Sequence, residues 1–260
     1  MIIDAHAHIF PDKIAVKAST AVGTFYELPM NFDGTVASLL REGDSCGIDR
    51  YIVHSVATKP EQVESITDFI IESVRQYPDK FIGFAAMHQD YKDKAGFIDR
   101  VIAAGLKGVK IHPDFQEVAL SDSRLWELFE IIEGRLPIQI HTGDYRYKWS
   151  NPEYVVKILD RFPKLDLIGA HFGGWSEWDK AAELLVGKRM WVDCSSSFYS
   201  MSPQKAYDLI QAFGADRVLF GSDYPMWSPK TELEFFNKLP LSEAERELIL
   251  HKNIENLLGL

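Results

Sequence analysis

The sequence predicts an α/β fold of the (β/α)8 TIM-barrel type, with a single domain over residues 1–260 and a C-terminal helical tail. Eight short apolar runs recur along the chain, and segments with helical periodicity separate most of them. Runs that are apolar at nearly every position are typical of parallel strands covered on both faces. Eight strand–helix units in about 250 residues are the number that closes such a barrel. An open doubly wound sheet is the alternative.

The expected elements follow from these two periodicities. Helices are predicted where apolar residues recur at i, i+3, i+4 and i+7, as in PEQVESITDFIIESVRQY, DKAGFIDRVIAAG and NPEYVVKILDRF. The final segment begins with a candidate capping box, Ser242 with Glu245, which predicts the start of the helical tail. The expected strands are residues 2–9, 51–57, 81–88, 108–112, 137–141, 165–171, 190–195 and 218–223.

The composition is that of an ordinary globular protein. The chain is 46% hydrophobic and 25% charged, and no linker or low-complexity tract divides it. A formal net charge of −10 disfavours the broad basic surface that nucleic acid requires, so no nucleic-acid partner is expected.

Cysteine content and hydropathy bear on the compartment. Only Cys46 and Cys194 occur, far apart in the sequence, which disfavours a disulfide framework and fits a reducing environment. No window approaches the roughly 18 uninterrupted apolar residues of a membrane span. A cytoplasmic location without a membrane partner is the expectation.

The histidines cluster at the expected strands. The side chains of functional residues in barrels gather at the C-terminal ends of the strands, so this clustering predicts a site there. Only His251 lies elsewhere, in the helical tail. The strand histidines are His6, His8, His54, His88, His112, His141 and His171.

The stretch DAHAHIF carries an HxH pair, which is a weak signal alone. Because side chains alternate along a strand, His6 and His8 point to one side and can share a cation. Further donors follow other apolar strands: His141 in QIHTGD, His171 in GAHFGG and Asp223 in FGSDYP. A histidine-rich set with one carboxylate suits Zn²⁺, with Mn²⁺ or another divalent first-row ion as alternatives.

These motifs resemble the amidohydrolase superfamily, in the amidohydrolase-related branch that includes aminocarboxymuconate-semialdehyde decarboxylase. The resemblance runs in order from DAHAHIF through GVKIHP, QIHTGD, HFGG and FGSDYP to NIENLLGL. It implies that His6, His8, His141 and Asp223 bind one metal ion. It also implies that His171 acts beside the activated water, with Asp223 as the next candidate base.

The fourth expected strand brings Lys110 and His112 to one face, where both are candidate substrate-binding residues. In binuclear members of the superfamily a lysine at this strand is carboxylated and bridges two metals, and this is the alternative to a one-metal site. His54 and His88 are expected to be hydrogen-bonded core histidines.

Aromatic residues are abundant in the segments that follow the strands. Phe25, Tyr26 and Trp175 are typical of a pocket wall, and Arg146 or Lys148 is placed to meet a substrate carboxylate. The same aromatic residues would equally suit a homodimer interface.

The predicted function is a metal-dependent hydrolase that uses metal-activated water on a small, anionic ester, lactone or amide. The alternative is a non-oxidative, metal-dependent decarboxylase of a small unsaturated or aromatic carboxylic acid. A binding protein with a structural metal is disfavoured because the ligand set leaves an open position. A TatD-type nuclease is disfavoured because Lys110 stands where that family has a glutamate.

Overall fold

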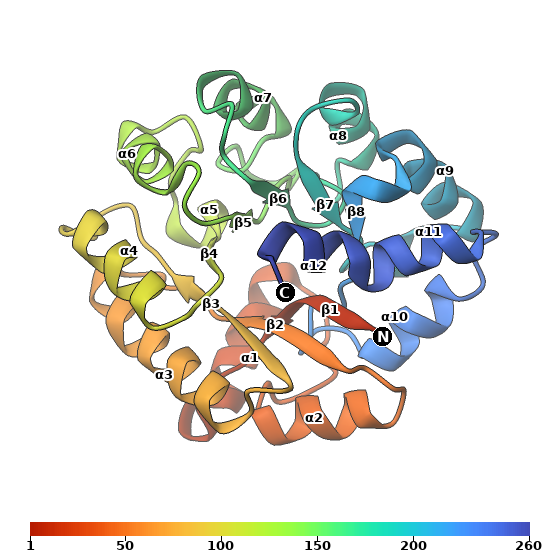
Figure 1. The fold of residues 1–260 in the computed structure, drawn as a ribbon, viewed down its shortest axis with the longest axis horizontal. Helices are drawn as coiled ribbons and strands as arrows, with labels where there is room; N and C mark the ends of the chain where they lie inside the picture. Colours follow the sequence, from red (N-terminus) through yellow and green to blue (C-terminus); the bar gives the residue numbers. More distant parts are fainter.

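A computed structural model describes all of residues 1–260 and contains one sheet of eight parallel strands in sequential order (Figure 1). The prediction of a TIM barrel is confirmed: seven expected strands contain an observed one, and β2 begins one residue before the expected second strand. The strands are β1 (Ile3–His8), β2 (Arg50–His54), β3 (Phe81–Ala86), β4 (Gly108–Ile111), β5 (Ile138–Ile140), β6 (Leu167–Gly169), β7 (Trp191–Asp193) and β8 (Val218–Leu219).

The segment after β8 closes the sheet against β1. The Ala5 amide donates to Phe220 O at 2.8 Å, and the Asp223 amide donates to His6 O at 2.8 Å. Ala7 then forms a parallel bridge with Tyr224. This closure brings the residues that follow β8 directly beside the HxH pair.

Helices surround the strands, and most begin at a side-chain cap. Asn151, Ser202 and Ser228 each cap a helix whose first residue is proline, a residue whose fixed φ suits that position. The helices are α1 (Asp12–Tyr26), α2 (Val36–Asp44), α3 (Val63–Gln76), α4 (Lys94–Ala103), α5 (Pro113–Gln116), α6 (Ser123–Ile132), α7 (Pro152–Arg161), α8 (Trp178–Leu185), α9 (Pro203–Phe213), α10 (Pro229–Phe236), α11 (Glu243–Glu247) and α12 (Asn253–Leu258).

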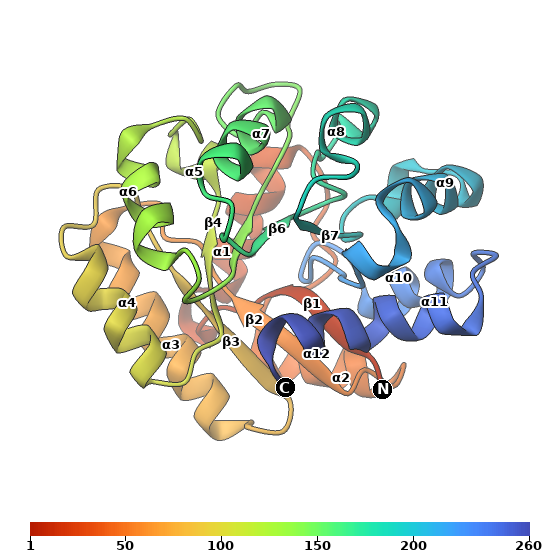
Figure 2. The same cartoon turned by 45° about the horizontal axis from the view of Figure 1, so that its top comes forward.

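The helical tail closes the N-terminal end of the barrel. It begins at the predicted capping box, in which Ser242 and Glu245 bond each other's backbone amides, and a π-helical turn at Leu248–Lys252 joins α11 to α12. Figure 2 shows α12 crossing this end of the barrel beside both chain termini. An apolar cluster of nine buried residues fills the interior there: Ile3, Ala5, Ile52, Ile82, Phe84, Ile168, Leu219, Ile254 and Leu258.

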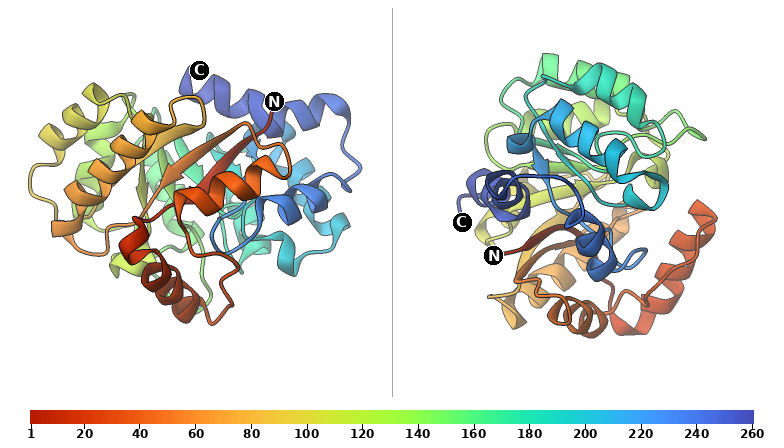
Figure 3. Two further views of the ribbon diagram at one scale, coloured as in Figure 1. Left: turned by 90° about the horizontal axis from the view of Figure 1, so that it is seen from below. Right: turned by 90° about the vertical axis from the view of Figure 1, so that its right-hand side faces the viewer.

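The β1–β2 connection differs from the expectation. The residues Phe25 and Tyr26, expected only as part of the segment that follows the first strand, form the last turn of α1, a helix of 15 residues. Figure 3 shows α1 at the end of the barrel opposite the two termini. No helix of the structure combines the length and apolar character needed to cross a bilayer.

Candidate metal centre and its cavity

A bulge in β1 turns both histidines of the HxH pair into the barrel. The pairing of β1 with β2 shifts between Asp4 and Ala7, so one extra residue is accommodated in β1. Ala5 therefore belongs to the inner apolar cluster, whereas Ala7 belongs to the outer core between strands and helices. His6 and His8 also face inward, and both line a cavity at the C-terminal end of the strands.

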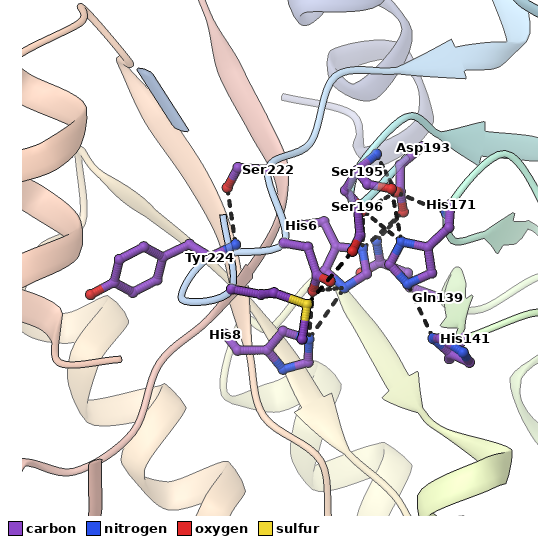
Figure 4. Close-up of polar contacts among 12 residues, drawn as sticks. His6, His8, Gln139, His141, His171, Asp193, Ser195, Ser196, Ser222 and Tyr224 are labelled. Carbon is purple, nitrogen blue, oxygen red and sulfur yellow. Dashed lines mark hydrogen bonds and ion pairs between the residues drawn. The ribbon is translucent and has the colours of Figure 1, made fainter. Parts of the chain in front are cut away.

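His6, His8 and Asp223 converge on one point. His6 Nε2 lies 3.3 Å from His8 Nε2, and Asp223 Oδ1 lies 3.3 Å from the first nitrogen and 3.4 Å from the second. Figure 4 shows the two imidazoles facing each other at the centre of the site. Three donor atoms at these separations can share one cation.

Asp193, at the end of β7, fixes the tautomer of His6. Its Oδ2 lies 3.1 Å from His6 Nδ1 and also accepts a 2.8 Å hydrogen bond from Gln139 Nε2. With a proton on Nδ1, the His6 Nε2 atom carries a lone pair that faces the other two donors. A carboxylate behind a histidine in this way is the usual support of a metal-binding imidazole.

His141 and His171 form a second pair of facing nitrogens. His171 Nδ1 donates to Ser195 O at 2.9 Å, and His141 Nε2 donates to Gly143 O at 3.1 Å. The remaining atoms, His171 Nε2 and His141 Nδ1, are 3.1 Å apart and both present lone pairs. Two lone pairs in contact require a proton or a metal ion between or beside them.

Two site residues adopt left-handed backbone conformations that are costly for residues other than glycine. The φ angles are 59° at His171 and 62° at Asp223. Each such residue costs of order 1–3 kcal/mol and persists only when its surroundings hold it. The His171 amide is held by Asp193 Oδ1 at 3.2 Å, and the Asp223 amide is held by the carbonyl of His6. Both expected catalytic residues thus have a strained backbone.

Burial sets the charges of the site. It lowers the pKa values of His6, His8 and His141 below the usual value, so these imidazoles are neutral, as metal ligation requires. Burial alone would raise the pKa of Asp223, but the adjacent His6 and His8 hold it below its usual range. The donor set therefore consists of neutral nitrogens and one carboxylate, which fits a divalent cation.

Lys110 and His112 lie in the cavity, as the sequence predicts. Lys110 Nζ is 3.1 Å from His6 Nε2, and burial lowers the pKa of this lysine to about 8, against the effect of Asp193 and Asp223. His112 stacks on His141 with ring centroids 3.9 Å apart and bonds the Tyr26 hydroxyl at 2.7 Å. Tyr26 is thereby brought from α1 to the edge of the site.

Arg146 and Trp175 lie behind the cavity wall rather than in it. The Arg146 guanidinium forms a bidentate pair with Asp144 and donates to Phe25 O at 2.6 Å. It also lies over the rings of Tyr26 and Trp175. Neither Arg146 nor Trp175 is among the residues that line the cavity. Both instead contact the last turn of α1 and hold it in place.

The prediction of a hydrogen-bonded core environment is wrong for His54. This histidine is completely buried, neither ring nitrogen has a hydrogen-bond partner, and its ring packs against those of His6 and His8. Residue alternation in β2 could not reveal this, because the register of β2 against β1 decides it. His88 does bond locally, accepting from the Asp90 amide at 3.1 Å.

The cavity around these residues has a volume of about 780 Å³. Its polar end is formed by His6, His8, Lys110, His112, His141, His171 and Asp223, with Asp114 beside them. Much of the remaining lining is apolar and comes from α1 and α3. A concave apolar site with a few converging polar groups is typical of an enzyme that binds a small molecule.

The comparisons agree with this architecture. The family described as Amidohydrolase matches residues 3–260, so the chain belongs to the amidohydrolase family. Among curated relatives, gamma-resorcylate decarboxylase of Polaromonas sp. is 24% identical over 250 residues, which cover 77% of each chain. The decarboxylase orsB of Emericella nidulans is 26% identical over 153 residues, which cover 47% of this chain and 45% of the relative. The chain thus matches less than half the length of that relative.

A solved structure has the same fold. It is dihydroxybenzoic acid decarboxylase of Polaromonas sp., with bound manganese and the inhibitor 2-nitroresorcinol. The TM-score is 0.78 at 19% identity, covering 100% of this chain and 97% of the other. These comparisons favour the alternative function, decarboxylation, over the hydrolysis that the sequence analysis placed first.

Proposed function

We propose that the protein is a metal-dependent decarboxylase of small aromatic carboxylic acids. The observation that carries the proposal is the similarity, over three quarters of each chain, to a decarboxylase of a hydroxylated benzoic acid. The histidine-rich cavity supports it, because its polar end combines a ligand set for a cation with a further histidine, His171, that can exchange a proton at Nε2.

The proposed ligands are His6, His8, His141 and Asp223. A divalent cation held by these residues supplies a Lewis acid that attracts an anionic acid to this end of the barrel. Nitrogen ligands suit Zn²⁺, and the manganese of the similar structure makes Mn²⁺ the other ion to test. Carboxylation of Lys110 and a second metal are not needed for this set, since three imidazoles and one carboxylate complete it.

Other residues of the chain would bind the acid. The polar groups next to the ligand set include the Tyr26 hydroxyl, His112 Nε2 and Lys110 Nζ. A cationic Lys110 attracts a carboxylate, and the Tyr26 hydroxyl can hydrogen-bond a phenolic oxygen.

His171 is the proposed proton donor. Its Nδ1 is held by Ser195 O, so protonation and deprotonation take place at Nε2, and the side chain lines the cavity. The proton adds to the ring carbon that bears the carboxylate. The bond to the carboxylate then breaks, CO₂ leaves, and the electron pair of that bond restores the aromatic ring. Asp223, held ionised, is better suited to ligation than to proton donation.

The test is turnover of a panel of hydroxylated benzoic acids in D₂O by protein loaded with Mn²⁺ or Zn²⁺. A panel of lactones and esters in ¹⁸O-labelled water runs in parallel. The proposal predicts one CO₂ per turnover and one deuterium on the ring carbon that lost it. Incorporation of ¹⁸O into a new carboxylate, without CO₂, would restore hydrolysis as the function.

A further inference from the structure

Helix α1 turns its apolar face toward the cavity instead of toward a protein core. Ile14, Ala18, Ala21, Val22 and Phe25 follow the spacing of one helical face, and all five line the cavity. A stripe of this kind normally packs on the core of the molecule. Here Ile14 remains 49% exposed, which leaves apolar surface for an occupant to cover.

The opposite wall of this region is also largely apolar, although Thr58, Gln62 and Ser65 line the cavity there too and Lys17 lines it from α1. Ile66 and Phe69 of α3 line the same cavity, together with Val56 from the segment after β2. We call the space between α1 and α3 the apolar chamber, defined by Ile14, Ala18, Ala21, Val22, Ile66 and Phe69. The chamber is continuous with the polar end, because both sets of residues line a single cavity.

The combined cavity is larger than a single-ring acid requires. Its volume of about 780 Å³ lies in the upper part of the range, roughly 300–1,000 Å³, in which sites hold drug-sized ligands. A benzoic acid with its carboxylate at the ligand set would leave the chamber filled only with water. Water in an apolar space is readily displaced by apolar groups.

Helix α1 is fixed where it meets the polar end. Arg146 bonds Phe25 O, and the Tyr26 ring packs on Trp175 with centroids 4.9 Å apart. The first turns of α1, by contrast, are solvent-exposed, with Val16 at 67% exposure. The chamber therefore has an inner end, next to the reacting groups, that these contacts anchor, and a more accessible outer end.

We infer that the substrate acid carries an apolar substituent larger than a methyl group, such as an alkyl chain or a second ring, and that the apolar chamber binds it. This inference rests on the proposed function for the identity of the acid head group. The chamber itself requires only that the anionic head lies at the polar end and the apolar group between α1 and α3.

The physical consequence is a dependence of affinity on chain length. Each methylene buried in the chamber should tighten binding about fourfold, until the chamber is full. Substituents of increasing length on one head group thus measure the depth of the subsite directly.

The experiment is calorimetric binding of 2-nitroresorcinol and its 4- and 5-alkyl derivatives, from methyl to hexyl, to Mn²⁺-loaded protein. These ligands have no carboxylate to lose, so binding is measured apart from turnover. The variant Ala18→Phe fills the chamber from α1. The matched control is Val16→Phe, which adds the same ring to the exposed face of the same helix.

In wild type and Val16→Phe, affinity should rise with chain length in at least one positional series. In Ala18→Phe the rise should disappear while the unsubstituted ligand binds as before. Equal affinity along both series in wild type would overturn the inference. So would a dimer in light scattering that Val16→Phe leaves intact and Ala18→Phe disrupts, because a second copy of the chain would then be the occupant.

Failure of the proposed function looks different. If no aromatic acid releases CO₂ but affinity still rises with chain length, the chamber is a subsite of an enzyme with another reaction. If short benzoic acids release CO₂ and chain length has no effect, the function stands and the chamber inference falls.

Discussion

The two ends of the barrel are built from the same strands but from opposite chemistry. At the N-terminal end, Ile254 and Leu258 of α12 pack on Ile3, Phe84 and Ile168 in a fully apolar interior. At the C-terminal end the strands present the histidines and Asp223. Burial of apolar side chains at the N-terminal end therefore stabilises the fold. At the C-terminal end, buried polar groups and the strained backbone at His171 and Asp223 lower the free energy of unfolding.

This difference predicts distinct phenotypes at the two ends. Substitutions at the polar end should change metal content and turnover with little loss of stability. Substitutions at the closed end should lower stability and leave the metal in place. The one-residue bulge in β1 marks the boundary between the two ends: Ala5 belongs to the apolar cluster of the closed end, and His6 faces the cavity of the open end.

The largest effect is expected from the proposed ligands. His141→Ala or Asp223→Ala should lose the metal and lower kcat/KM by more than about 10³-fold, because the cation supplies several kcal/mol of charge stabilisation. His171→Asn should lose turnover while it keeps close to one metal ion per chain. Elemental analysis and steady-state kinetics of the same preparations separate the two roles. A metal-free His171→Asn protein would make His171 a ligand.

The closed end should show the converse. Phe84→Ala removes a completely buried ring and should lower the free energy of unfolding by about 3–5 kcal/mol. Denaturant titration measures the loss of stability. Elemental analysis of the folded variant should show the same metal content per chain as wild type. Loss of metal from the folded variant would show that the two ends are coupled.

An intermediate effect on metal affinity is expected from Asp193, which hydrogen-bonds the proposed ligand His6. Asp193→Asn keeps the shape of the side chain but removes the charge that orients His6. Metal affinity should fall about 10- to 100-fold in competition with a chelator of known affinity. Asp90→Asn, beside His88 and away from the cavity, is a matched control that should leave metal affinity at the wild-type value.

The smallest effect is expected at the anchor of α1. Arg146→Lys loses the bidentate contact with Asp144, a difference of about 1.5 kcal/mol for a charge-assisted hydrogen bond. KM should rise by up to about tenfold, with kcat nearly constant, because Tyr26 and the cavity wall are less well positioned. A fall in kcat with unchanged KM would instead give Arg146 a role in the reaction itself.

The repeating part of the fold was predictable because each strand is a continuous apolar run and each outer helix has a face that packs on the core. Helix α1 was missed for a physical reason. Its inward face has helical spacing, but small residues such as Ala18 and Ala21 make the apolar signal weaker than in a helix that packs on the core.

The proposed ligands were identified because each lies at the end of an apolar strand, in a motif that resembles those of the amidohydrolase superfamily, and because three of them are histidines, a rare residue type. Asp193 occupies an equivalent place at the end of β7, but an aspartate without a motif carries no signal until His6 is seen beside it. His54 was assigned to the core because its contact with the HxH pair depends on strand register, which one sequence does not contain.

Anomalous diffraction from crystals of the Mn²⁺-loaded protein tests the central claim most directly. The account predicts one peak per chain at the C-terminal end of the barrel, within bonding distance of His6, His8, His141 and Asp223. Two peaks bridged by a carboxylated Lys110 would contradict the one-metal site, and a peak bound to none of these four residues would contradict the site itself.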